Sequence, residues 1–248
     1  MPDTAQRPPD AATLFADVAA VASAYFDARA SGDGARLDAL ATPIWHGKRV
    51  NATGDIVVEQ RSALATPSEL MQITAIAPCF DDFATVRGDN WNGCTTTFLL
   101  LFKAHGAWTV AGELSADVGA RARDAHFAAR AAEHEVLSVL HEYYRGVTHG
   151  DGAAMRRIFA PCWHMKNHEG EALVSEETEA FVQRLDGDYS TYWNDRQIAD
   201  VHVAGDRIAY VRVNRPSTPS TTVFLFARTP PGWRITDKAW TDGRKPTA

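Results

Sequence analysis

The sequence predicts an α+β protein made of two tandem copies of one domain, each with helices packed on one face of a curved antiparallel sheet so that a cone is left between them. Two ungapped internal repeats predict the duplication, and the same order of helices and strands in both copies predicts the class. The length of 248 residues fits one large domain or two small ones. The repeats decide for two, each of roughly 115 residues.

The first repeat appears when the sequence is shifted by 118 positions. Val18–Lys48 then falls on Val136–Lys166 without a gap, with 11 identities in 31 positions. A shift of 125 positions places Ile73–Asp117 on Ile198–Asp242, with 10 identities in 45 positions. The offsets differ by 7, so the second copy carries a net insertion of 7 residues between the two repeats.

These repeats give the expected domain boundaries. We expect a disordered N-terminus at 1–10, a first domain at 11–119, a second domain at 120–243 and a tail at 244–248. Residues 120–134 contain no proline or glycine. This segment is therefore expected to be a helical connector that extends the first helix of the second copy.

An amphipathic helix is expected to open each copy. In both copies the apolar residues of its buried face are spaced 4, 3 and 4 positions apart, as on one face of a helix. They are Leu14, Val18, Val21 and Tyr25 in the first copy and Val136, Leu140, Tyr143 and Val147 in the second. A Gly-Asp-Gly sequence follows, in which glycine suits a helix C-cap and aspartate an N-cap. A short second helix is then expected to end at Pro43 or Pro161.

Strands and one more helix complete each copy. Turns at Asn51–Asp55 and Asn167–Glu171 predict a hairpin. A third helix is expected at Thr66–Glu69 in the first copy, which has a capping-box pattern, and after Ser175–Glu177 in the second. The second copy then continues with four strands: Gln197–Val203, Arg207–Asn214, Thr221–Arg228 and Trp233–Thr241.

Composition excludes several classes of protein. With 31 acidic and 25 basic residues, the net charge is −6 and the bases are scattered, which argues against a nucleic-acid partner. The longest apolar run, Thr97–Phe102, is far shorter than the roughly 20 residues of a membrane helix. No signal peptide, paired Cys-x-x-Cys motif or nucleotide-binding glycine motif is seen, so we expect a cytoplasmic protein without a cofactor.

The motifs of the second copy resemble the nuclear-transport-factor-2-like (NTF2-like, or SnoaL-like) superfamily. They are Tyr143-Tyr144-x-Gly146, Gly150-Asp151, Phe159-x-Pro161 and Trp233-x-Ile235-x-x-Lys238, and they most resemble the subfamily named "putative lumazine-binding". The resemblance covers nearly all of 136–242 and, more weakly, 18–117. It implies a cone-shaped fold, frequent dimerisation through the sheets and a small, mostly apolar pocket. Members include ketosteroid isomerases, dehydratases, polyketide cyclases and an epoxide hydrolase, whereas many others only bind or scaffold.

Comparison with the steroid isomerases is informative where it fails. Their first-helix tyrosine, which donates to the developing oxyanion, corresponds to Tyr25 and Tyr143. Their general-base aspartate corresponds to Arg49 and Asn167, and neither side chain can take a proton from carbon at neutral pH. Isomerase chemistry of that kind is therefore disfavoured in both copies.

We expect the ligand pocket in the second cone. Tyr143, Trp163 and Asn167 would line it and suit a flat heterocycle such as a pterin or flavin ring, unless the aromatic residues are simply core. The matching positions in the first copy, which we expect to be more scaffold-like, are Tyr25, Trp45 and Arg49. Asp237 is expected to share the face of Trp233 and Ile235. It would then either add a charge to the cone or form a structural salt bridge. Lys238, which aligns with Glu113 of the first copy, is expected to lie on the other face of the strand.

Other candidates carry alternatives. His46, Lys48, His164 and Lys166 are expected to face the partner sheet. Cys162, His164 and His168 could share a face, but no fourth ligand lies near them in the sequence, so no metal is expected. The insertion contains aromatic residues that would either close the second cone as a lid or pack on the connector: Tyr189, Tyr192 and Trp193.

The sequence thus favours an intramolecular pseudo-dimer of two domains that binds a small aromatic or heterocyclic molecule in its second cone. It leaves open whether such fused pairs form a further homodimer. The alternatives are a lyase or isomerase-type enzyme (a dehydratase, cyclase or ketosteroid-isomerase-like protein) and a non-catalytic structural or interaction module. No catalytic residue is assigned.

Overall fold

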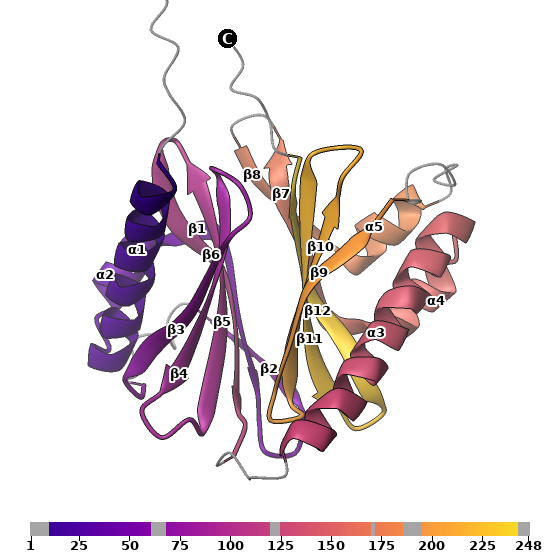
Figure 1. Cartoon of the computed structure of the whole chain (residues 1–248), viewed down its shortest axis with the longest axis horizontal. Coiled ribbons are helices and arrows are strands. Elements are labelled where there is room, and N and C mark those ends of the chain that lie inside the picture. Colours follow the sequence, from indigo (N-terminus) through magenta and orange to yellow (C-terminus); the bar gives the residue numbers. More distant parts are fainter. Residues whose placement is uncertain (1–9, 61–67, 120–124, 170–171, 186–194, 243–248) are drawn as a thin grey trace, which may run out of the picture.

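The computed structural model describes residues 10–60, 68–119, 125–169, 172–185 and 195–242. They form two α+β domains whose sheets face each other at the centre of the molecule, with the helices on the two outer sides (Figure 1). The α+β class and the two tandem domains predicted from the sequence are therefore confirmed.

The described residues of the first domain form two helices and a six-stranded sheet with the strand order β2-β1-β6-β5-β4-β3. Its elements are α1 (Ala11–Ser31), α2 (Gly34–Leu40), β1 (Ala41–Val50), β2 (Ile56–Glu59), β3 (Met71–Pro78), β4 (Phe83–Asn90), β5 (Thr95–Ala104) and β6 (Ala107–Asp117). The β1–β6 pair is parallel and the others are antiparallel. The sheet is therefore mixed, where the sequence predicted an antiparallel one.

The second domain repeats this order with one additional described helix. Its elements are α3 (Ala125–His149), α4 (Gly152–Ile158), β7 (Phe159–Glu169), β8 (Ala172–Glu177), α5 (Thr178–Arg184), β9 (Gln197–Ala204), β10 (Ile208–Arg215), β11 (Ser220–Thr229) and β12 (Gly232–Thr241). The strand order is β8-β7-β12-β11-β10-β9, and β7 pairs with β12 in parallel. The two sheets thus have the same topology.

The Gly-Asp-Gly sequences shape the chain as predicted. Gly32 and Gly150 have φ angles of 71° and 66°, the left-handed conformation that ends a helix at glycine. Asp33 then accepts a hydrogen bond from the backbone N–H of Arg36 at 3.0 Å, and Asp151 caps α4 in the same way. Both copies therefore turn from the long helix into the short one by the same local chemistry.

Three local expectations were wrong. The short helices α2 and α4 end at Leu40 and Ile158, and Pro43 and Pro161 lie inside the strands that follow. Residues 68–70 are not helical, so the helix expected from Thr66 is absent from the described part of that region. Its counterpart in the second domain is present as α5, and the connector is helical from Ala125 onward.

The molecule has one hydrophobic core in each domain and a third between the sheets. In each domain core, the long helix packs its apolar face on the sheet, with Tyr25 or Tyr143 fully buried. The third core joins residues of both domains, among them Phe98, Leu100 and Tyr210. The convex sheet faces are thus covered by each other, and the concave faces by helices.

Helix α1 is long and apolar enough to cross a membrane, as judged by its length and composition alone. In the structure it lies along the outer side of the first sheet (Figure 1), and Val18, Ala22 and Phe26 are buried against that sheet. A helix that packs in a protein core can have the same length and composition.

Candidate functional site

A β-bulge in β12 decides which of its side chains face the second cone. Leu225 pairs with Asp237 and the next residue, Phe226, pairs with Ile235, so Thr236 is an extra residue in β12. Ile235 before the bulge packs in the domain core. After the bulge the alternation is reversed, and Lys238 faces the concave side while Asp237 faces the other sheet.

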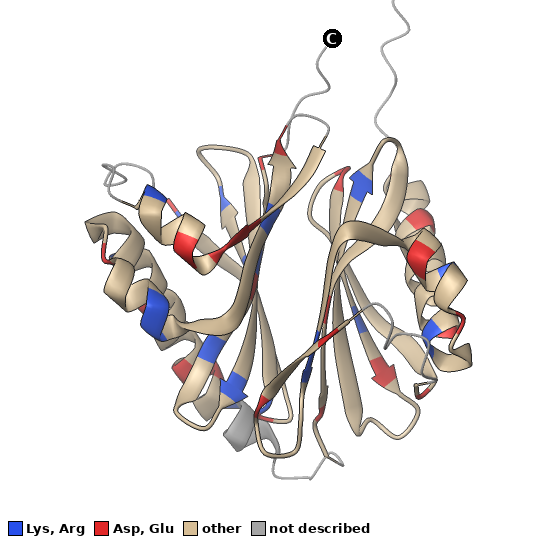
Figure 2. Ribbon diagram, turned by 180° about the vertical axis from the view of Figure 1, so that it is seen from behind, with Lys and Arg blue, Asp and Glu red and all other residues tan. Residues whose placement is uncertain are grey.

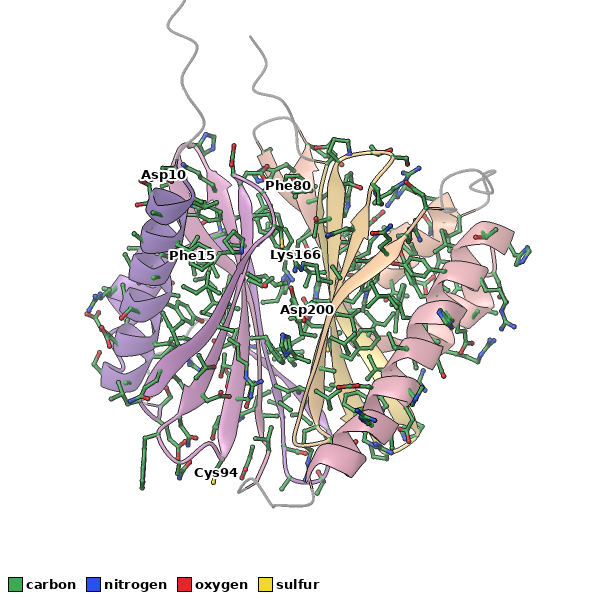
Figure 3. The ribbon with its side chains drawn as sticks, in the orientation of Figure 1. Asp10, Phe15, Phe80, Cys94, Lys166 and Asp200 are labelled. Carbon is green, nitrogen blue, oxygen red and sulfur yellow. The ribbon has the colours of Figure 1, made fainter. Side chains whose placement is uncertain are left out.

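Asp237 therefore does not line the cone, and this expectation is corrected. Its carboxylate accepts hydrogen bonds from Lys166 at 2.6 Å and pairs with Lys48 at 2.8 Å, with all three side chains at most 2% exposed. Figure 3 shows Lys166 in the space between the sheets. Burial alone would raise the pKa of Asp237, but the two ammonium groups hold it below its usual value. The alternative of a structural salt bridge is the one that the structure supports.

The same interface contains two stacked histidines. The rings of His46 and His164 lie 3.5 Å apart between centroids, with an angle of 22° between their planes. Partial burial, together with the charges of Lys48 and Lys166, lowers the pKa of His46 to about 4 and that of His164 to about 3. Both residues therefore face the partner sheet as neutral rings, as their position on the strand predicted.

The second cone contains a cavity of about 590 Å³ between the concave sheet face, β8 and α5. Its walls combine apolar side chains with polar and charged ones, and the charged ones include the acids Glu169, Glu176 and Asp242. Its lining includes Val147, Met165, Asn167, Val174, Glu176, Phe181, Arg184, Leu185, Arg196, Val213, Arg215, Thr222, Lys238 and Trp240. A cavity of this volume is in the usual range for a small-molecule site.

Lys238 is the buried amine of this cavity. The residue is 7% exposed, and its Nζ donates to the Met165 sulfur at 3.5 Å. The rings of Tyr143 and Phe181 lie 5.7 and 5.6 Å from the same nitrogen. Burial, and then the nearby charges of Arg196 and Arg184, lower the pKa of Lys238 to about 7.

Three arginines line the same cavity as the amine. Arg184 pairs with Glu176, with Nε donating to Oε1 at 2.6 Å, and Arg215 donates to Asp195 at 3.1 Å. The guanidinium of Arg196 lies over the Tyr144 ring at 4.1 Å from its centroid. Among the described residues, no carboxylate forms an ion pair with Lys238.

Of the three residues expected to line the second pocket, Asn167 does so. The Tyr143 side chain is fully buried beneath the cavity and stacks with Phe181 at 6.3 Å between centroids. Trp163 stacks on Phe159 in the core, with 4.1 Å between the ring centroids. It also borders a separate hollow at the start of β7. The core alternative therefore holds for the aromatic pair, and the residues expected to form a lid lie outside the described part of the chain.

The first cone also contains a cavity, of about 520 Å³. Arg49 lines it, as expected, together with Arg29, Glu59 and Glu113. Trp45 does not line it, because its ring is folded over Gly47 in the domain core. The first domain is therefore not a filled scaffold, and its cavity matches the second in size.

A hydrogen-bonded acid network fills the depth of the first cavity. Tyr25 donates its hydroxyl to Glu113 at 2.6 Å, and Arg29 lies 3.6 Å from Glu113 and 2.9 Å from Glu59. Burial raises the pKa of Glu113, an effect that Arg29 opposes and Glu59 adds to. Glu113 occupies the position that aligns with Lys238 in the second domain.

The sequence shows opposite charges at this aligned position, but unbroken strand alternation placed Lys238 on the face away from the cone. The bulge in β12 overturns that placement. A bulge lies at the same point in the first domain, where Leu100 pairs with Gly112 and Leu101 with Val110. Figure 2 shows acidic and basic residues mixed over both domains, without one sign gathered on one face.

One protein-family model matches part of the chain. Residues 131–241 match a family model described as "Putative lumazine-binding". This match runs from within α3 to the end of β12. No curated protein matches the chain.

Three solved structures that are similar to this chain each cover less than half of it. An NTF-2 like protein of unknown function from Silicibacter pomeroyi DSS-3 is 22% identical over 49% of this chain and 98% of its own, with a TM-score of 0.39. An NTF2-like protein of unknown function from Shewanella baltica OS155 is 16% identical over 46% and 94%, with a TM-score of 0.37. A ketosteroid isomerase-like protein from Erwinia carotovora atroseptica SCRI1043 is 20% identical over 42% and 95%, with a TM-score of 0.33.

Proposed function

We propose that this chain binds a small, flat, negatively charged molecule in the cavity of its second domain, the part that matches the family model described as "Putative lumazine-binding". The observation that carries this proposal is the buried Lys238 amine in a cavity of about 590 Å³, whose walls include the apolar side chains of Val147, Phe181 and Trp240. A flat aromatic or heterocyclic body suits the walls, and an anionic group suits the amine.

The preference for an anion follows from the cost of burying a charge. A buried ammonium without a carboxylate partner is unfavourable, and a ligand anion relieves that cost when it enters. Lys238 would gain a charge-assisted hydrogen bond in this way, and Arg196 lies at the same wall. Asn167, also in the lining, offers an amide that can pair with the edge of a heterocycle.

The test compares pterin-6-carboxylate with pterin, which has the same ring and lacks the carboxylate, by isothermal titration calorimetry at pH 6. At that pH Lys238 is mostly protonated, given its pKa of about 7. A hydrogen bond between charged groups contributes about 1.5–3 kcal/mol, so the carboxylate should bind about tenfold or more tightly.

The variant Lys238→Met should remove this difference while it keeps the apolar volume. Its matched control is Glu113→Gln, at the aligned position of the first cone, which should keep the preference. Equal affinity for the two pterins in the wild type, or a preference that persists in Lys238→Met, would contradict anion binding at this site.

A second candidate function rests on the first cone. Glu113, with its raised pKa and its hydrogen bond from Tyr25, is a buried acid in a cavity of about 520 Å³. Such a group suits proton transfer to or from carbon, as in an isomerase or dehydratase. Exchange of the α-hydrogens of a cyclic enone in D₂O, followed by NMR, should then be catalysed by the wild type and lost in Glu113→Gln; exchange that is absent from the wild type removes the candidate.

A further inference from the structure

The position of Lys238 in its cavity is unusual for a lysine. The amine lies deep in the cone, against a thioether and two aromatic rings, and not at the rim where a lysine would reach water. The bulge at Thr236 is what turns this side chain inward. A long side chain that ends inside a hollow of small-molecule size is placed to touch whatever enters.

The surroundings also favour an uncharged amine. The charged and titratable groups nearest to it are Arg184 of α5, Arg196 ahead of β9, Glu176 of β8 and Tyr143 of α3. The same cavity is also lined by Glu169 of β7, Arg215 of β10 and Asp242 after β12. Glu176 is itself paired with Arg184, so the field at the amine is not neutralised by a carboxylate of its own. Desolvation and neighbouring cations are the two means by which proteins activate a lysine as a nucleophile.

We infer that Lys238 is a nucleophilic amine that forms an imine with a small aldehyde or ketone bound in the second cavity. This inference rests on the proposed function, since the carbonyl compound must first bind there. The expected class is an aromatic carbonyl compound with an anionic group, because the cavity wall holds Arg184 and Arg196 beside the amine.

The step is balanced without an added reactant. The Nζ lone pair attacks the carbonyl carbon, a C–N bond forms, and the carbonyl π electrons move to oxygen. One amine proton is transferred to that oxygen, which gives a carbinolamine. The C–O bond then breaks, the second amine proton is lost, and a C=N bond and one molecule of water are formed. No oxidation or reduction takes place.

Two of the other lysines are poorly placed for this chemistry. The chain has five: Lys48, Lys103, Lys166, Lys238 and Lys245. Lys48 and Lys166 are fully buried between the sheets, where both pair with Asp237. The first cone has Glu113 at the matching position, so the reactive amine belongs to the second cone alone among the described residues.

The experiment uses the full chain, with 4-carboxybenzaldehyde as the probe and sodium cyanoborohydride to reduce any imine to a stable amine. Intact-mass analysis should show one adduct, and peptide mapping should place it on Lys238. Labelling should fall at least tenfold in Lys238→Met and stay at the wild-type level in the control Lys103→Arg. Adducts spread over several lysines, or undiminished labelling of Lys238→Met, would overturn the inference.

Two further measurements do not depend on how a variant folds. In the wild type, the labelling rate should rise with pH and level off above about pH 7, following the pKa of Lys238, whereas an ordinary lysine would continue to gain reactivity up to about pH 10. 4-Carboxybenzyl alcohol, which has the same ring and carboxylate but no carbonyl, should compete with labelling. A rate that rises continuously, or a lack of competition, contradicts a reactive amine in the cavity.

The alcohol also separates the two proposals. If calorimetry shows that it binds and Lys238 is still not labelled by the aldehyde, anion binding stands and the imine is overturned. If the alcohol does not bind and no labelling occurs, this class of ligand is wrong and both proposals fail for it.

Discussion

The two cavities share their position and size but differ in the chemistry at one aligned position. In the first domain, Glu113 accepts a hydrogen bond from the first-helix tyrosine and lies near Arg29. In the second, Lys238 lies against Met165, and Val147 occupies the position of Arg29. The neighbours therefore differ together with the charge. One fold can hold an acid in one cone and an amine in the other, because each cone supplies its own partners.

The interface shows the same asymmetry. Asp237 aligns with Gly112, so one carboxylate serves both Lys48 and Lys166. A Cβ at Gly112 would lie 3.3 Å from Cδ1 of Leu100 and 3.4 Å from the Lys166 nitrogen, so glycine lets these side chains pack closely here. Two identical domains would bring two copies of every group to this interface. In the described part of this chain, the two lysines instead share the single carboxylate of Asp237.

Removing that carboxylate is expected to have the largest effect. Asp237→Ala would leave two buried ammonium groups without their counter-ion, and breaking a buried pair costs about 3–5 kcal/mol. Urea denaturation at pH 7 should show this loss in the free energy of unfolding. The control Asp17→Ala, at an exposed position of α1, should stay within about 0.5 kcal/mol of the wild type. A similar small change in Asp237→Ala would mean that the lysines are solvated and that the interface is not closed as described.

The aligned pair should respond in opposite directions. Glu113→Gln keeps an acceptor for Tyr25 but removes the charge beside Arg29, and should lower stability by about 1–3 kcal/mol. Lys238→Met removes a buried amine that has no ion pair among the described residues, and should leave stability at pH 7 equal to or above that of the wild type. Urea denaturation of both variants tests this; a loss of the same size in each would remove the contrast between the cones.

The duplication, the helices and most strands could be predicted because they depend on local patterns. The spacing of Val136, Leu140, Tyr143 and Val147 describes a helix face directly, and all four side chains are buried. The facing of His164 and Lys166 toward the other sheet also followed from simple alternation along β7. These signals are carried by a few neighbouring residues and need no knowledge of the rest of the fold.

The cavity lining could not be predicted in the same way. The bulge at Thr236 exchanges the faces of Asp237 and Lys238, and no residue type in that strand marks it. Tyr143 and Trp163 suit a pocket wall and a core equally well, and only the packing of Phe159 and Phe181 around them places them in the core. Arg196 reaches the cavity from just outside β9, a contact that depends on the tertiary fold.

The stacked histidines offer the smallest test of how the two domains are held together. Their pKa values of about 4 and about 3 lie below the ordinary value of 6.5, so the unfolded chain binds more protons than the folded chain between about pH 4 and 6.5. Stability should therefore fall as the pH drops through this window. Between pH 7 and pH 6 we expect a loss on the order of 1 kcal/mol in the free energy of unfolding, after allowance for the partial exposure of both rings.

The double variant His46→Phe, His164→Phe keeps a ring stack and cannot be protonated, so urea denaturation at the two pH values should show a smaller loss than in the wild type. His141→Asn, at an exposed position of α3 away from the interface, serves as the control and should lose as much as the wild type. An unchanged loss in the double variant would mean that protonation of His46 and His164 is not the cause of the fall in stability between pH 7 and pH 6.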